Sequence, residues 1–208
     1  MAYQLSDINF KTVADPKGFI EECDEVYRRR VETAADKIIA NRKNSPIVLL
    51  SGPSGSGKTT TARKISEELE RKGVHAHYVG MDDYFMTVDP ATAPRTAEGE
   101  IDLESPLCLD MELLNEHFDL LAQGKRIYVP KYEFSRQMRM FEPSKSIKLK
   151  KDEIVVFEGI HALNDMITER HPEAFKLYIS ARSNVEFNGS VVFKGTWFRL
   201  VRRTVRDY

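Results

Sequence analysis

The segment at residues 46–59 constrains the fold more than any other part of the chain. Pro46–Leu50 is a short continuous apolar run, the pattern of a parallel strand that is covered on both faces. It leads into Gly52-Pro53-Ser54-Gly55-Ser56-Gly57-Lys58-Thr59, which matches the pattern GxxxxGK[ST]. Lys58–Arg71 then has apolar residues at helical spacing, and Gly73 is a typical helix stop. Strand, glycine-rich turn and helix in this order predict a phosphate-binding loop at Gly52–Thr59.

The residue types in this loop indicate how it would hold a nucleotide. Its glycines let the backbone curl so that successive N–H groups point at phosphate oxygens, and the helix start adds partial positive charge. Lys58 is placed to reach the β- and γ-phosphates, and the Thr59 hydroxyl is placed to ligate Mg²⁺. We therefore expect ATP and Mg²⁺ as cofactors. The expected ATP-binding residues are Gly52, Ser54, Gly55, Ser56, Gly57, Lys58, Thr59 and Thr60.

Downstream of the loop, strand-like apolar runs alternate with helical segments, which predicts an α/β fold. We expect a P-loop NTPase architecture, a doubly wound and mostly parallel sheet with helices on both faces. Asn188-Gly189 lies between β-prone residues and predicts a hairpin. The expected strands are His75–Met81, Arg126–Phe134, Ser146–Lys150, Ile154–Phe157 and Lys176–Ile179, and the expected later helices are Pro106–Gln123, Asn164–Arg170 and Trp197–Asp207.

Composition excludes several classes of protein. The formal net charge of −1, from 31 basic and 32 acidic residues, argues against a nucleic-acid binder. The longest apolar runs are too short to span a bilayer, and no signal peptide is visible. We expect a cytoplasmic protein with a small-molecule substrate and with no nucleic-acid or membrane partner. The sequence leaves open whether it forms a homo-oligomer. The histidines His75, His77, His117 and His171 form no metal-ligand pattern along the sequence.

Two predicted strands end in acidic residues, where ligands bind in doubly wound sheets. One continues into Asp82-Asp83, and the other ends in Glu158-Gly159. Phosphoryl transfer to a hydroxyl needs a carboxylate to accept the proton and an acidic group to help hold Mg²⁺. Asp82 and Glu158 are the candidates for these roles, whereas Asp83 is expected to be an ordinary surface acid.

Taken together, these motifs resemble the uridine kinase/phosphoribulokinase family over roughly residues 45–208. The resemblance rests on the loop, Asp82-Asp83-Tyr84-Phe85, Val129–Phe134, Phe157-Glu158-Gly159-Ile160 and Arg199–Arg203. It implies that Asp82 takes the proton of the acceptor hydroxyl, with Thr59 and Glu158 on the magnesium side. It further implies catalytic roles for Lys58 and Arg202, and substrate binding by Glu104, Tyr132, Phe134, Arg139 and Arg199.

Arg199, Arg202, Arg203 and Arg206 fall on one helix face, and behind a phosphate loop such a face fits a lid that delivers arginines to the transferring phosphate. We expect residues 45–208 to form the kinase domain and the natural protein to continue past Tyr208. Residues 1–44 are expected to be a helical extension packed on the core. Its helix over residues 16–43 would begin at the N-cap Asp15 and bury one stripe of apolar residues from Phe19 to Ile39.

Three departures from the family pattern concern the acceptor. Glu104-Ser105-Pro106 replaces Asp-His-Pro, Gln137 replaces a base-reading histidine, and residues 184–197 look like an insertion. The predicted function is ATP-dependent transfer of the γ-phosphate to a hydroxyl of a small metabolite, with a nucleoside as the leading candidate and uridine itself as a poor substrate. The alternatives are a kinase of a non-nucleoside small molecule and a non-catalytic nucleotide-binding module. A GTPase-type switch is disfavoured because no Asn-Lys-x-Asp tetrapeptide occurs.

Overall fold

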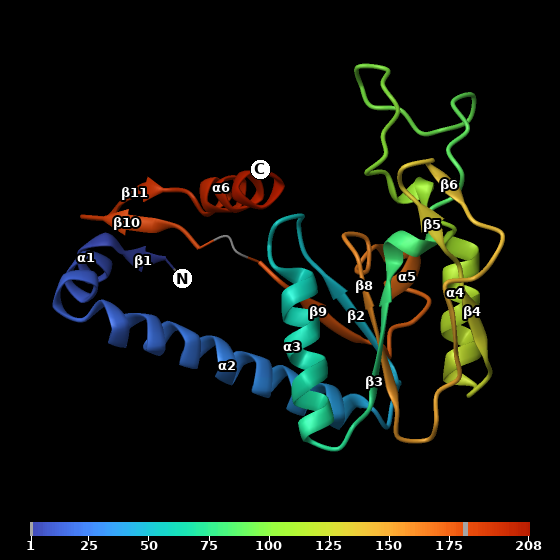
Figure 1. The fold of residues 1–208 in the computed structure, drawn as a ribbon, viewed down its shortest axis with the longest axis horizontal. Coiled ribbons are helices and arrows are strands. Elements are labelled where there is room, and N and C mark those ends of the chain that lie inside the picture. Colours follow the sequence, from blue (N-terminus) through green and yellow to red (C-terminus); the bar gives the residue numbers. More distant parts are fainter. Residues whose placement is uncertain (1, 181–182) are drawn as a thin grey trace.

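A four-stranded parallel sheet forms the centre of the molecule in the computed structural model, which describes residues 2–180 and 183–208, the side chains of residues 206 and 207 excepted. Its strands are β2 (Ile47–Ser51), β3 (Ala76–Gly80), β8 (Ile154–Glu158) and β9 (Phe175–Tyr178). Their order is β3-β8-β2-β9, and every neighbouring pair is parallel (Figure 1). The parallel α/β fold of a P-loop NTPase predicted from the sequence is confirmed.

Helices cover both faces of this sheet because its strands are apolar on both sides. Within β2, Ile47 and Leu49 face one buried cluster, whereas Val48 and Leu50 face the other. The first cluster contains α4 (Met111–Ala122) and α5 (Asp165–Thr168), and the second contains α2 (Pro16–Asn41) and α3 (Lys58–Arg71). The sheet is therefore doubly wound, with the phosphate-binding loop between β2 and α3.

Helix α3 begins and ends where the sequence predicts. Gly57 precedes it at a φ of 91°, in the left-handed region that glycine adopts without strain. At the other end Gly73 also has a positive φ of 77°, and the Val74 N–H donates to the Leu69 carbonyl at 2.9 Å. Leu69 and Val74 are both buried in the same cluster, which completes a Schellman-type stop.

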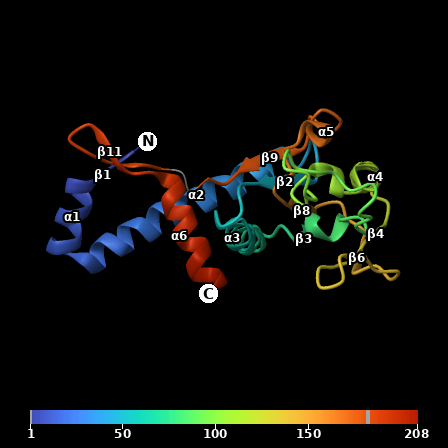
Figure 2. The same ribbon diagram turned by 90° about the horizontal axis from the view of Figure 1, so that it is seen from above.

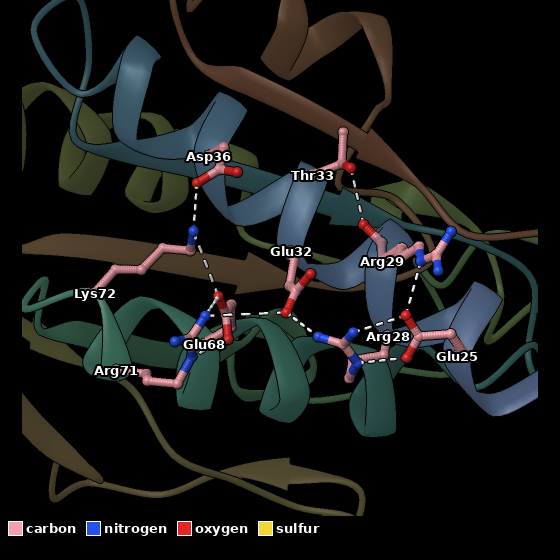
Figure 3. A network of polar contacts seen from close by, with 9 residues as sticks. All are labelled: Glu25, Arg28, Arg29, Glu32, Thr33, Asp36, Glu68, Arg71 and Lys72. Atoms are coloured by element: carbon pink, nitrogen blue, oxygen red, sulfur yellow. Dashed lines mark hydrogen bonds and ion pairs between the residues drawn. The ribbon is translucent and has the colours of Figure 1, made fainter. Parts of the chain in front are cut away.

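The C-terminal half of α2 packs along α3. Val31, Ala35 and Ile38 are buried there, and ion pairs join the exposed sides of the two helices (Figure 3). Lys72 on the α3 side contacts Asp36 of α2 at 2.6 Å. Such exposed pairs contribute little each, so the buried apolar stripe holds the helices together. The residues of this polar network are Glu25, Arg28, Arg29, Glu32, Thr33, Asp36, Glu68, Arg71 and Lys72.

The N-terminal half of α2 leaves the core, which corrects the expected continuous stripe. Ile20 is 62% exposed and Val26 is 44% exposed. Figures 1 and 2 show this half reaching toward a second small sheet of β1 (Tyr3–Gln4), β10 (Val185–Phe187) and β11 (Ser190–Phe193), beside α1 (Leu5–Ala14) and α6 (Gly195–Asp207). Strand β1 pairs in parallel with β10, so the N-terminal segment lies beside the segment that leads through β11 into α6. The boundary between an N-terminal extension of residues 1–44 and a kinase domain of residues 45–208 stays a prediction.

The predicted hairpin at Asn188-Gly189 is present, whereas the predicted strand Arg126–Phe134 is divided. Asn188 and Gly189 both have positive φ between β10 and β11, so the hairpin is confirmed. The predicted strand Arg126–Phe134 is two strands, β4 (Ile127–Val129) and β5 (Tyr132–Glu133), because Pro130 lacks an N–H and interrupts the ladder. These strands pair with β7 (Lys145–Ile147) and β6 (Met138–Arg139) respectively.

The predicted helix Pro106–Gln123 is also divided. A short helical turn, η2 (Pro106–Cys108), is followed by α4, whose N-cap Asp110 accepts a hydrogen bond from the Leu113 N–H at 3.1 Å. The N-cap residue has a non-helical backbone, which explains the break. Among the helices in the described part of the chain, none combines the length and the apolar character needed to cross a membrane.

The two halves of α2 differ in burial, which predicts different effects of the same substitution. Ile38 is 2% exposed and Ile20 is 62% exposed. Ile38→Ala should lower the free energy of unfolding by about 2–5 kcal/mol, because it removes buried methyl groups and leaves a cavity. Ile20→Ala is the matched control and should stay within about 0.5 kcal/mol of the unmodified chain. Urea denaturation checks both; equal effects would contradict the described packing of α2.

Candidate active site

A cleft of about 840 Å³ lies at the carboxyl ends of the central strands. It joins the phosphate-binding loop to acidic, apolar and arginine side chains from five other parts of the chain. Most of the residues predicted from the sequence line it: Ser54, Gly55, Gly57, Lys58, Thr59, Thr60, Asp82, Glu104, Phe134, Glu158, Arg199 and Arg202. The cleft is not lined by four of the predicted residues: Gly52, Ser56, Tyr132 and Arg139.

The loop has the features of an anion cradle. A Cβ atom on Gly52 would lie 2.3 Å from the Ile179 carbonyl oxygen, so only glycine fits there. The hydroxyl oxygen of Ser56 is buried and, among the described residues, has no hydrogen-bond partner. A buried polar group without a partner is costly unless a ligand satisfies it. The donor set of this loop therefore fits a phosphate group.

Glu158 is the centre of the polar contacts at the base of the cleft. Its carboxylate accepts hydrogen bonds from the Thr59 hydroxyl at 3.1 Å and from the Tyr78 hydroxyl at 2.7 Å, and it lies 3.7 Å from the Lys58 ammonium. The Lys58 and Glu158 side chains are each only about a tenth exposed. Carboxylate and hydroxyl oxygens are suitable Mg²⁺ ligands, so Thr59 and Glu158 fit the metal-side roles expected of them.

Tyr78 is the residue that sequence reasoning missed. It belongs to β3, next to β8 in the sheet, and its hydrogen bond orients the Glu158 carboxylate. Burial and the contact with Glu158 both raise the pKa of Tyr78, so it stays protonated and donates the hydrogen bond. Its position four residues before Asp82 gave no signal, because a tyrosine within a strand is commonly a packing residue.

Asp82 and Asp83 differ in their surroundings. Both belong to the short helical turn η1 (Met81–Tyr84) after β3, but only Asp82 lines the cleft. Burial and then the nearby Glu158 carboxylate raise the pKa of Asp82, against the opposing effect of Lys58. Burial raises the pKa of Asp83 as well, so the pKa does not separate the two acids, whereas their positions relative to the cleft do. The geometry therefore favours Asp82 over Asp83 as the acid at the reaction centre.

The wall opposite the loop combines apolar and acidic groups. Phe85, Leu103, Glu104 and Phe134 line it. The resemblance implied substrate binding by both Tyr132 and Phe134, but only Phe134 lines the cleft; β5 ends at Glu133, so the strand alternation does not extend to Phe134. Tyr132 is buried and Phe134 is 61% exposed. The rings of Tyr132 and Phe134 pack edge to face with centroids 5.0 Å apart, and the Phe85 ring lies beside both. Tyr132 therefore supports the aromatic wall from behind.

Arg139 lies in β6, where its guanidinium is held by protein groups. It donates to Asp110 at 2.7 Å and to the carbonyl oxygens of Tyr84 and Phe85 at 2.8 and 3.2 Å. These contacts fix the backbone just after Asp82. Arg139 thus supports the acid-bearing turn in this structure, and direct substrate binding by it stays a prediction.

Helix α6 brings its arginines to the phosphate-binding loop. Arg199, Arg202 and Arg203 line the cleft, and Arg199 donates to the Ser54 carbonyl oxygen at 3.3 Å. The Arg202 guanidinium lies 3.3 Å from the point where a Cβ on Gly57 would be. The side chain of Arg206, expected on the same face, lies outside the described residues. Three like charges beside a phosphate-binding loop indicate a site for a polyanion.

Comparison with known proteins agrees with this geometry. The model of the phosphoribulokinase/uridine kinase family matches residues 47–192. The chain belongs to this family. The matched region runs from β2 through the loop, the acid-bearing turns and the β10–β11 hairpin.

Individual relatives cover different shares of the chain. A uridine kinase from Ligilactobacillus salivarius is 34% identical over 173 residues, which is 81% of this chain and 70% of that protein. One from Halobacterium salinarum is 31% identical over 158 residues, 76% of this chain but only 60% of that protein. Among solved structures, a "possible uridine kinase" from Bacillus stearothermophilus superposes with a TM-score of 0.50 at 22% identity, covering 64% of this chain and 68% of that one. This structural similarity shows that the two proteins share a fold.

The loop geometry predicts the effect of removing the Lys58 ammonium. Lys58→Ala should weaken ATP binding by about 10- to 100-fold, since hydrogen bonds to charged groups contribute about 1.5–3 kcal/mol. Arg63→Ala, an exposed position on the same helix, is the control and should bind ATP normally. Isothermal titration with ATP and Mg²⁺ measures both affinities. Normal binding by the Lys58 variant would contradict the assignment of the loop.

Proposed function

We propose that this protein is an ATP-dependent kinase that transfers the γ-phosphate to a hydroxyl group of a nucleoside. The observation that carries the proposal is the cleft itself, in which the phosphate-binding loop, Asp82 and a wall with an exposed aromatic ring enclose one space. Membership of the phosphoribulokinase/uridine kinase family supports the reaction class. The relatives named as uridine kinases support a nucleoside as the acceptor.

The two expected cofactors fit the residues present. The unpartnered Ser56 hydroxyl and the backbone curve at Gly52 and Gly57 suit the phosphates of ATP. Thr59 and Glu158 offer the oxygen atoms that would hold Mg²⁺. When bound, the ion would neutralise charge on the β- and γ-phosphates.

The chain's own residues account for the remaining chemistry. Asp82 accepts the proton of the acceptor hydroxyl while the acceptor oxygen forms a bond to the γ-phosphorus. The bond from the γ-phosphorus to the bridging oxygen breaks, and its electron pair leaves with ADP. Lys58, Arg199 and Arg202 balance the negative charge on the transferring group, and α6 above the loop limits the access of water.

The acceptor end of the cleft has one acidic and several apolar groups. Glu104 is suited to hydrogen-bond sugar hydroxyls, and Phe134 is suited to stack on a base. Gln137, which stands where the family reads the base with histidine, is in the turn between β5 and β6 and does not line the cleft. The expectation that uridine is a poor substrate therefore rests on Glu104 alone and stays a prediction. Kinases of non-nucleoside alcohols are the alternative that the same cleft accommodates.

The neighbouring acids Asp82 and Asp83 allow a matched test of the proposed reaction. Asp82→Asn keeps the size of the side chain but removes the proton acceptor, so kcat should fall by about 10²-fold or more. ATP affinity should change little, because the loop is intact. Asp83→Asn is the control and should retain most of the activity, since Asp83 does not line the cleft.

Steady-state kinetics with ATP and a nucleoside mixture measures both variants. A large loss in the Asp83 variant with a small loss in the Asp82 variant would reverse the assignment. Full activity in both would contradict the proposed mechanism.

A further inference from the structure

A cluster of two histidines and a glutamate lies at the end of the sheet opposite the cleft. His75 directly precedes β3, His77 belongs to β3, and Glu153 directly precedes β8. Strands β3 and β8 are parallel neighbours, so both begin at this end of the sheet. Their other ends lead to Asp82 and Glu158, which places the cluster away from the candidate active site.

The side chains of this cluster point toward one another. His75 and His77 are two residues apart in extended chain, so they project to the same side, and their rings meet edge to face with centroids 4.7 Å apart. Nε2 of His77 lies 2.9 Å from a carboxylate oxygen of Glu153. One ligand atom from each of the three residues lies within 4.8 Å of the other two.

Sequence spacing could not reveal this group. His75 and His77 alone form no metal-ligand pattern, and the glutamate that joins them comes from a strand 76 residues further along the chain. The pairing of β3 with β8 supplies the missing ligand. The folded chain thus brings together three potential ligand atoms that the sequence spacing of the histidines does not indicate.

We propose that His75, His77 and Glu153 form a binding site for a divalent transition metal ion, with Zn²⁺ as the best match. Two imidazoles and one carboxylate are a ligand set that Zn²⁺ favours, whereas Mg²⁺ and Ca²⁺ prefer oxygen ligands alone. Tetrahedral ligands at about 2.0–2.1 Å from Zn²⁺ lie roughly 3.3 Å apart. The three ligand atoms lie within 4.8 Å of one another, so they would draw closer together around the ion, and a water molecule would complete the tetrahedron.

The surroundings of the cluster fit this role. Nδ1 of His75 contacts the Glu70 carboxylate near the end of α3, and a second carboxylate on a ligating histidine is the usual way to orient its ring. The Lys150 ammonium lies 3.5 Å from Glu153 and would compete with a cation. Its side chain is 86% exposed, however, so it can turn into solvent when a metal ion binds.

The consequence is a further link at the start of two strands that already pair in the sheet. A bound ion would connect the starts of β3 and β8 to the end of α3 through Glu70. Because metal binds the folded arrangement and not the unfolded chain, it should raise the melting temperature. The site is independent of the proposed kinase reaction.

Titration of the whole chain with Zn²⁺ tests the site. The exposed thiol of Cys23 is first removed by Cys23→Ser in every variant, and excess Mg²⁺ is present to occupy the cleft. We expect about one equivalent of Zn²⁺ to bind and the melting temperature to rise. In His75→Gln combined with His77→Gln, and separately in Glu153→Gln, affinity should fall at least about tenfold. His161→Gln removes a histidine outside the cluster and should bind Zn²⁺ normally.

Co²⁺ in place of Zn²⁺ gives a second readout through its visible absorption. Intense tetrahedral bands in the parent chain that are lost in the double histidine variant would support the site. Absence of Zn²⁺ binding by the parent chain would overturn the proposal, as would unchanged affinity in both cluster variants. Circular dichroism establishes whether each variant is folded. If the double histidine variant is unfolded, the Zn²⁺ affinity of the Glu153→Gln variant alone tests the site.

Discussion

The contact of Glu158 with Thr59 and Lys58 is the interaction on which the candidate site depends. It exists because β2 and β8 are parallel neighbours, so the residues that follow both strands emerge at the same end of the sheet. The lysine and the carboxylate are mostly buried, and each would be costly there without the other. Tyr78 from the third neighbouring strand satisfies the carboxylate further. Three adjacent strands thus fix one polar centre beneath the phosphate-binding loop.

A series of contacts connects this centre to the arginine helix by way of the N-terminus. The Tyr27 hydroxyl of α2 hydrogen-bonds with Thr61 of α3 at 2.8 Å, two residues beyond Thr59. At the far end of α2, β1 pairs with β10, and Asn184 accepts from the Tyr3 N–H through its carbonyl and from the Gly195 N–H through its side chain, both at 2.9 Å. Gly195 begins α6. The N-terminal segment therefore supports both the loop helix and the helix that brings arginines to the loop.

Sequence reasoning succeeded where local chemistry decides the structure. The boundaries of α3, the apolar strands β2 and β8, and the hairpin at Asn188-Gly189 follow from periodicity and from residues that adopt positive φ. The cleft residues Lys58, Asp82 and Glu158 followed from motifs at strand ends. These features need only a few consecutive residues to be specified.

Prediction from the sequence failed where segments distant along the chain decide the structure. The exposure of Ile20 and Val26 reflects the lack of a core beside the first half of α2, which no helical pattern reveals. The contacts of Arg139 with Asp110 and of Tyr78 with Glu158 depend on the folded arrangement of the chain. Pro130 was visible in the sequence, and its effect on the predicted strand could have been anticipated.

We propose that this cleft moves the γ-phosphate of ATP onto a hydroxyl group of a nucleoside, a reaction that forms a phosphate monoester. The most direct measurement is ³¹P nuclear magnetic resonance of the protein with ATP, Mg²⁺ and a mixture of ribonucleosides. We expect a growing phosphate monoester signal that matches the ADP formed, and no such signal without nucleosides. Formation of inorganic phosphate alone, or ATP left unchanged under all these conditions, would contradict it.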